Sequence, residues 1–195
     1  MRRTTAIKPA VIALAAALAL AAAPGTAPAH AQLRPGSVAP LFTAEAAQGG
    51  QTMRFSLADA LKRGPVVLYF FPQAFTSGCT QEAHDFAQAM DDYRKLGAQV
   101  VGVSGDDLAT LGKFSVHDCA GKFPLVADKD RAVMKAYDSV LVPMTSYASR
   151  TSYVITPDDK ILYAYNALNP DQHVANTLAA LTQWRATHPA DAAAH

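Results

Sequence analysis

Apolar residues occur in two patterns along this chain, continuous runs and helical spacings, and the two alternate. The run Pro65–Pro72 is apolar throughout and rich in β-branched and aromatic residues, which indicates a strand buried on both faces. Residues 80–96 instead repeat apolar positions every three or four residues, which predicts an amphipathic helix that Gly97 ends. Strands and helices that alternate in this way are typical of a sheet covered by helices.

The same alternation continues to the end of the chain. Prolines and glycines interrupt residues 32–64, so an irregular or hairpin-like lead-in is expected there, ending in a short helix at 56–61. The later predicted elements are a strand at 98–104, a helix at 107–119, a strand at 123–127, a helix at 130–137, a loop at 138–149, a hairpin of 151–156 with 161–165, and a helix at 171–185. This order predicts an α/β domain of thioredoxin-like fold, with a mixed central sheet flanked by helices on both faces.

The first 31 residues have the pattern of a secretory signal peptide. Three basic residues come first, Pro9–Ala23 is an almost unbroken apolar run, and Ala29-His30-Ala31 gives a cleavage sequence before Gln32. The apolar run is shorter than the roughly 20 residues that span a bilayer. We therefore expect an exported protein, in the bacterial periplasm, that has no membrane segment after cleavage; an uncleaved N-terminal anchor is the alternative.

Without the signal peptide, a single domain is expected over residues 32–186, followed by a flexible tail over 187–195. This part of the chain has 14 basic and 16 acidic residues, a net charge of −2. Such a nearly neutral balance gives no reason to expect a nucleic-acid partner.

Chemistry is expected at the two cysteines, Cys79 and Cys119. In an exported protein they meet an oxidising compartment, where either a structural disulfide or redox chemistry is open to them. Cys79 lies between a buried strand and a helix, where α/β sheets hold ligands and where helix N-terminal N–H groups stabilise a thiolate. Three residues earlier, Thr76 offers a hydroxyl where thioredoxin-like redox motifs have a cysteine, so a local Cys-x-x-Cys disulfide is excluded.

The motif Pro72-x-x-x-Thr76-x-x-Cys79 resembles the active-site motif of the peroxiredoxins, the AhpC/TSA-like thiol-dependent peroxidases that have a thioredoxin fold. The similarity covers most of residues 36–182 and is carried by four ordered segments: Cys79–Glu82, Val101–Ser104, Phe123–Asp128 and Arg150–Ile155. Within the family, the pattern is most similar to the Q-type, or bacterioferritin comigratory protein, subgroup. Four ordered segments are specific, whereas Thr-x-x-Cys alone would be a weak signal.

The resemblance implies a role for each matching residue. Cys79 corresponds to the peroxidatic cysteine, Pro72 to the shielding proline, Thr76 to the hydroxyl donor and Arg150 to the active-site arginine. Glu82 occupies a position that is commonly acidic in the subgroup, with a supporting role at most.

The chain departs from the family pattern at the resolving cysteine. His84 stands where many members carry that cysteine, five residues after the peroxidatic one. The resemblance therefore assigns the resolving role to Cys119 on the next helix, in an intramolecular pair with Cys79. Some members of the subgroup place the resolving cysteine there.

The implied activity is the reduction of hydrogen peroxide and organic hydroperoxides. Cys79 would become a sulfenic acid and then a disulfide, which a thioredoxin-like or other dithiol reductant would reduce. The resemblance implies a monomer that needs no cofactor.

Two other interpretations stay open. One is an exported thioredoxin-like module for disulfide exchange or metal delivery, although Thr76 argues against it. The other is a binding protein with a structural disulfide, whose loop of about 40 residues would stabilise it by about 4 kcal/mol. A metal site is not predicted, because the histidines at 84, 117, 173 and 188 lack ligand spacing and are expected on solvated helix faces.

Overall fold

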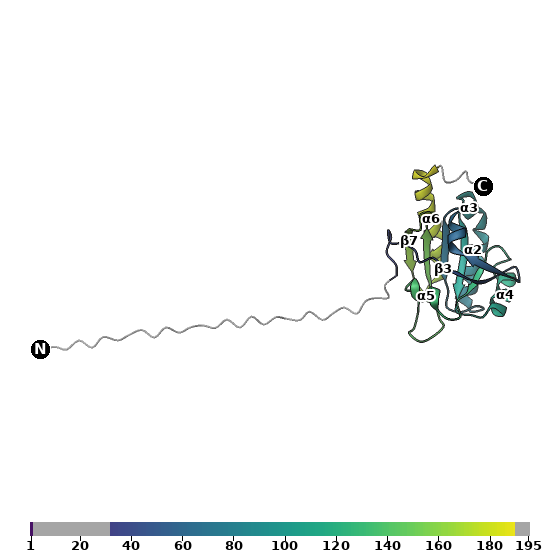
Figure 1. The fold of residues 1–195 in the computed structure, drawn as a ribbon, viewed down its shortest axis with the longest axis horizontal. Helices are drawn as coiled ribbons and strands as arrows, with labels where there is room; N and C mark the ends of the chain where they lie inside the picture. The colour runs from purple at the N-terminus through teal and green to yellow at the C-terminus, as the bar shows by residue number, and fades with distance from the viewer. Residues whose placement is uncertain (2–31, 190–195) are drawn as a thin grey trace.

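A computed structural model describes Met1 and residues 32–189 of the chain (Figure 1). The predicted signal peptide and the last six residues of the predicted tail lie outside the described residues. Among the residues that are described, no helix is long and apolar enough to cross a membrane.

Seven strands form one sheet in the order β2-β1-β5-β4-β3-β6-β7. Their bounds are β1 Thr43–Gln48, β2 Gln51–Ser56, β3 Val66–Phe70, β4 Gln99–Ser104, β5 Leu125–Ala127, β6 Thr151–Ile155 and β7 Ile161–Asn166. The central strands β3, β4 and β5 are parallel, and the other pairs are antiparallel. The predicted mixed sheet is confirmed, and β1 with β2 makes the expected lead-in a hairpin.

Helices cover both faces of the sheet, as the sequence predicts (Figure 1). They are α1 Leu57–Leu61, α2 Ser77–Gln88, α3 Met90–Lys95, α4 Leu108–His117, α5 Ala132–Ala136 and α6 His173–Thr187, with a 3-10 turn at Pro170–Gln172 before α6. One core cluster packs α2, α3, α4 and α6 against the sheet and contains both cysteines. The other packs α1 and α5 against the opposite face. The sheet therefore separates two apolar cores.

The single helix predicted over residues 80–96 is wrong, because the chain turns at Ala89 between α2 and α3. The Ala87 carbonyl, which a continuous helix would use internally, accepts a hydrogen bond from Lys122 Nζ at 2.8 Å. The turn leaves both Met90 and Tyr93 buried. At the other end of the chain α6 extends to Thr187, the first residue of the predicted tail.

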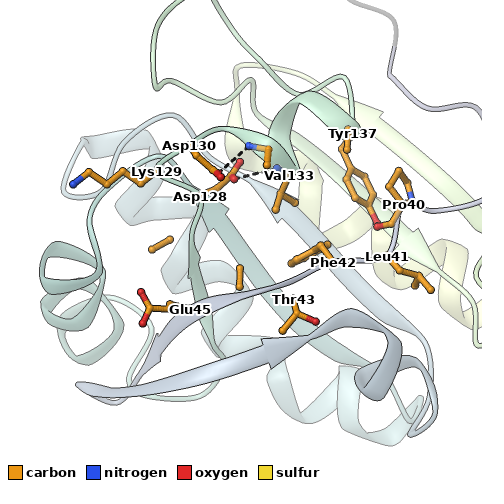
Figure 2. A pocket seen from close by; sticks show the side chains of 14 residues that line it. Pro40, Leu41, Phe42, Thr43, Glu45, Asp128, Lys129, Asp130, Val133 and Tyr137 are labelled. Carbon is orange, nitrogen blue, oxygen red and sulfur yellow. Dashed lines mark hydrogen bonds between the residues drawn. The ribbon is translucent and has the colours of Figure 1, made fainter.

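Asp128 fixes the connection between β5 and α5. Its buried carboxylate accepts a hydrogen bond from the backbone N–H of Val133 at 3.0 Å (Figure 2). It accepts a second from the backbone N–H of Met134 at 2.7 Å. These are N–H groups of the first turn of α5, which have no partner inside the helix. Asp128 therefore caps α5 and ties it to the end of the sheet.

Replacing Asp128 with alanine should lower the free energy of unfolding by about 1–2 kcal/mol, because two buried N–H groups lose their acceptor. Urea unfolding followed by circular dichroism measures the change. The matched control is Asp91→Ala, which removes an exposed ion pair with Arg94 and should have a much smaller effect. Equal losses in the two variants would contradict the capping role.

Candidate active site

Cys79 lies in the first turn of α2, in the loop-to-helix segment that follows β3. The first hydrogen bond of the helix is donated by the Thr80 N–H to the Thr76 carbonyl at 2.9 Å. The N–H groups of residues 77–79 therefore have no acceptor within the helix. The thiol is 1% exposed and belongs to the apolar core. A buried sulfur is thus held at the positive end of a helix.

Contacts with β4 and α4 hold the loop before α2 in place. Asp106, just after β4, accepts hydrogen bonds from the Ala74 N–H at 2.8 Å and from the Ser104 hydroxyl at 2.6 Å. Phe75 has a φ of 63°, in the left-handed region, and its ring packs edge-on against Phe114 of α4. Sequence reasoning missed Asp106, because an acidic residue at the end of a strand is a common surface feature.

Arg150 directly precedes β6, and the antiparallel pairing of Thr151 with Phe70 brings it beside the end of β3. Its Nη2 lies 3.4 Å from the Cys79 sulfur. Its Nε donates to the Leu168 carbonyl at 2.8 Å, and its Nη1 forms a short hydrogen-bonded ion pair with Glu82 Oε2. The structure therefore brings Cys79 and Arg150, 71 residues apart in the sequence, into contact.

Gly78 makes room for this guanidinium. A Cβ at position 78 would lie 3.1 Å from Arg150 Nη2, closer than almost all contacts of real Cβ atoms. The sequence position of Gly78, next to Cys79, gives no sign of this contact, because it depends on a side chain that arrives from β6.

Glu82 is fully buried one turn after Cys79 in α2. Burial raises the pKa of its carboxyl to about 8, although the charge and hydrogen bond of Arg150 oppose the shift. Its second oxygen, Oε1, lies 3.5 Å from Nδ1 of His173.

His173 is also fully buried, so the predicted solvated position is wrong for this histidine. The prediction holds for His84, His117 and His188, which are exposed. The side chain of His173 turns toward β6 and α2 at the start of α6, a placement that residue spacing alone does not reveal.

Thr76 and Pro72 lie in the same loop as Cys79. The Thr76 hydroxyl donates to the Gln73 carbonyl at 2.9 Å, so the predicted donation to the sulfur is not made in this structure. Its oxygen still has lone pairs that can accept a hydrogen bond at the exposed side of the loop. Pro72 is half-buried two residues after β3.

Cys119 follows α4 and is fully buried. Both cysteines are free thiols. Burial, and then the charge of Asp118, raise the pKa of the Cys119 thiol, so it remains protonated at neutral pH. Asp118 also lies 3.4 Å from His84 Nε2, which places the Cys119 segment beside the middle of α2.

Tyr69 of β3 links the surroundings of the two sulfurs. Its buried hydroxyl has no hydrogen-bond partner among the described residues. Burial is the main reason that its pKa is raised well above the ordinary value, and electrostatic interactions with Cys119, Glu82 and Cys79 raise it further. Tyr69 belongs to the same core cluster as both cysteines.

Among the described residues, no group of three or more His, Cys, Asp or Glu side chains is arranged to hold a metal ion. A cavity of about 640 Å³ between the start of β1 and α5 is lined by Phe42, Val133 and Tyr137 on the other face of the sheet (Figure 2). The site residues do not line that cavity.

Residues 35–164 match the AhpC/TSA family. The chain is 35% identical over 144 residues to the chloroplastic peroxiredoxin Q of Triticum aestivum, covering 73% of this chain and 64% of that protein. It is 36% identical over 150 residues to a Mycobacterium tuberculosis protein named as a peroxiredoxin, covering 74% of this chain and 92% of that protein.

The crystal structure of peroxidoxin BcpB from Mycobacterium tuberculosis superposes with a TM-score of 0.69 and 28% identity, covering 77% of this chain and 97% of that one. Sequence and structure therefore agree with the resemblance seen in the active-site motif. The chain belongs to the AhpC/TSA family and is a peroxiredoxin similar to the Q and Bcp members, a thiol-dependent peroxidase.

Proposed function

We propose that this protein reduces hydrogen peroxide and organic hydroperoxides with Cys79 as the attacking residue. The observation that carries the proposal is the Arg150 guanidinium 3.4 Å from the Cys79 sulfur at the start of α2. Arginine is always charged, and the free N–H groups of the first helical turn add positive potential. Together they favour the thiolate, which is the nucleophilic form of cysteine.

The first chemical step follows from this arrangement. The Cys79 thiolate forms a bond to one peroxide oxygen as the O–O bond breaks, and the second oxygen takes the electron pair, gains a proton and leaves as water or alcohol. Arg150 stabilises the charge that moves onto the leaving oxygen. Thr76 accepts a hydrogen bond from the peroxide, because its own hydrogen is held by Gln73.

The second step is an intramolecular disulfide between Cys79 and Cys119. The Cys119 sulfur bonds to the Cys79 sulfur as the S–O bond breaks, and the hydroxyl leaves as water with the thiol proton. Asp118, the neighbour of Cys119 in the sequence, contacts His84, which lies five residues after Cys79 and so about 7.5 Å further along α2 at 1.5 Å per residue. The first turn of α2 must therefore unwind before the two sulfurs meet.

The remaining features complete the proposed cycle. A thioredoxin-like or other dithiol reductant attacks the disulfide and restores both thiols. Cys79, Thr76, Arg150 and Cys119 all come from one chain, so the proposed cycle needs no second subunit, and the monomer implied by the resemblance is part of the proposal. The relatives that support this proposal are named as peroxiredoxins. Their peroxide chemistry is proposed for this chain as well.

Stopped-flow measurement of peroxide reduction tests the first step. Cys79→Ser should abolish rapid peroxide consumption. Gly78→Ala is a sharper test of Arg150, because the added methyl group displaces the guanidinium without leaving Glu82 unpaired. We expect a loss of about tenfold in the second-order rate constant, as for other small displacements of a catalytic charge.

Gly112→Ala is the matched control, since Gly112 also lies in a helix and a Cβ there meets no atom within 4 Å. Both substitutions replace glycine with a better helix former. A reduced rate in Gly78→Ala alone would thus reflect the contact with Arg150. Equal rates in both variants would remove that contact from the mechanism.

Mass spectrometry after one equivalent of peroxide tests the second step. The wild-type protein should lose two hydrogens as the Cys79–Cys119 disulfide forms. Cys119→Ser should stop at the sulfenic acid and oxidise further to sulfinic acid with excess peroxide. A wild-type protein that keeps Cys119 free beside a Cys79 sulfenic acid would be a one-cysteine enzyme instead.

We further propose that the protein is exported to the bacterial periplasm after cleavage before Gln32. The support is the basic, apolar and small-residue pattern of residues 1–31. N-terminal sequencing of protein from periplasmic and membrane fractions checks this proposal. A periplasmic protein that begins at Gln32 is expected, and a membrane-bound chain that retains Pro9–Ala23 would favour the uncleaved anchor.

A further inference from the structure

His173 is a buried histidine whose ring nitrogens both face polar atoms. Its Nε2 lies 3.0 Å from the Ala167 carbonyl oxygen. Its Nδ1 lies 2.8 Å from the Ser152 hydroxyl and 3.5 Å from Glu82 Oε1. The ring is therefore fixed between β6, α2 and the chain that follows β7.

The neighbours of His173 determine its hydrogen positions. A carbonyl oxygen can only accept, so Nε2 must carry the hydrogen that it donates to Ala167. In the neutral ring Nδ1 then has only a lone pair, which accepts from the Ser152 hydroxyl. The same lone pair faces Glu82 Oε1.

The Glu82 oxygen that faces His173 also lacks a hydrogen-bond donor. Its Oε2 accepts from Arg150, while Oε1 has no hydrogen-bond partner among the described residues. If Glu82 were ionised beside a neutral His173, the buried Oε1 would receive no hydrogen from the ring, because Nδ1 has only a lone pair, which is costly away from water. A proton on Oε1 removes this repulsion, and Nδ1 can then accept from Oε1 in place of the Ser152 hydroxyl.

We propose that Glu82 and His173 share one proton at neutral pH, so that the pair is neutral and the charge of Arg150 is left to stabilise the Cys79 thiolate. His173 is thus a positioning residue that acts through Glu82 and Arg150. The effect on catalysis rests on the proposed function of Cys79. The presence of one proton on the Glu82–His173 pair does not depend on that function.

The directions of the two titrations support this arrangement. Burial raises the pKa of Glu82 to about 8 and lowers the pKa of His173 to about 4, so the proton stays on the carboxyl at pH 7. It leaves as the pH rises through 8. Glu82 then becomes an anion that competes with Cys79 for Arg150, and the peroxide rate should fall.

Among the described residues, no hydrogen bond other than that of Arg150 reaches the Glu82 carboxyl. Tyr165 of β7 presents its ring edge to His173, and Thr177 of α6 bonds to the His173 carbonyl. The remaining titratable or charged groups that face the pair are Arg150, Cys79, Tyr69 and Asp85. Asp85 is an acid that raises the pKa of Glu82 further, and so favours the protonated carboxyl.

Carbon-13 NMR of side-chain carboxyl groups measures the proton directly. The chain contains only two glutamates, Glu45 and Glu82, so glutamate labelling gives two signals. Glu82→Gln identifies which signal belongs to Glu82. Over a titration from about pH 5 to about pH 10, the Glu82 signal should change near pH 8 in the wild-type protein.

His173→Gln should move that change to lower pH, because its amide N–H can donate to Glu82 Oε1 and favour the carboxylate. His117→Gln, at an exposed histidine, is the matched control and should leave the titration unchanged. A Glu82 signal that is already ionised at pH 5 in the wild-type protein would overturn the proposal, whether or not His173→Gln folds.

Peroxide kinetics then test the consequence for Cys79. His173→Gln should slow the peroxide step by about tenfold at pH 7, and in a Glu82→Gln background it should have little further effect. Equal losses in both backgrounds would mean that His173 acts only by packing, and would overturn the positioning role. A protein that shows the Glu82 titration but consumes no peroxide would leave the shared proton in place and contradict the proposed function instead.

Discussion

The buried guanidinium of Arg150 beside the Cys79 sulfur is the interaction on which the rest of the site depends. A charged group taken out of water must have its N–H donors satisfied, and each nitrogen of this guanidinium has its own acceptor: Leu168, Glu82 or Cys79. Leaving a buried charge without one of its partners typically costs about 3–5 kcal/mol. The pairing of β3 with β6, the carbonyl of Leu168 and the small volume of Gly78 are therefore all needed to keep one positive charge at the start of α2.

The Arg150 guanidinium is fixed by several hydrogen bonds, whereas the contacts that hold α2 differ between its first turn and the rest of the helix. Lys122 bonds to the Ala87 carbonyl and Asp118 approaches His84, so contacts from the Cys119 segment hold the middle and end of α2. The first turn is held mainly by the Arg150 contact and by the loop bond to Asp106. This difference is what the proposed second step requires: after oxidation weakens the contact between the sulfur and Arg150, the first turn would unwind while the remainder of α2 stays in the core.

The sequence predicts those features that depend on neighbouring residues. The buried strands are continuous apolar runs, and the position of Cys79 between strand and helix follows from that pattern. The turn at Ala89 could not be predicted in this way, because the carbonyl that it frees, that of Ala87, is bound by Lys122, 35 residues further along the chain than Ala87. Arg150 was found through the family resemblance alone, and the burial of His173 was missed because its partners Glu82 and Ser152 come from α2 and β6.

The different roles of the two cysteines follow from charge and not from burial. Both lie in the same core cluster, and both are almost completely shielded from solvent. Cys79 has a guanidinium and a helix N-terminus beside it, whereas Cys119 has the carboxylate of Asp118, which adds to the effect of burial and keeps the thiol protonated. A protonated thiol does not compete for peroxide, so in the proposed cycle oxidation begins at Cys79. The proposal then requires Cys119 to become a nucleophile only after the rearrangement that brings the two sulfurs together has removed it from this environment.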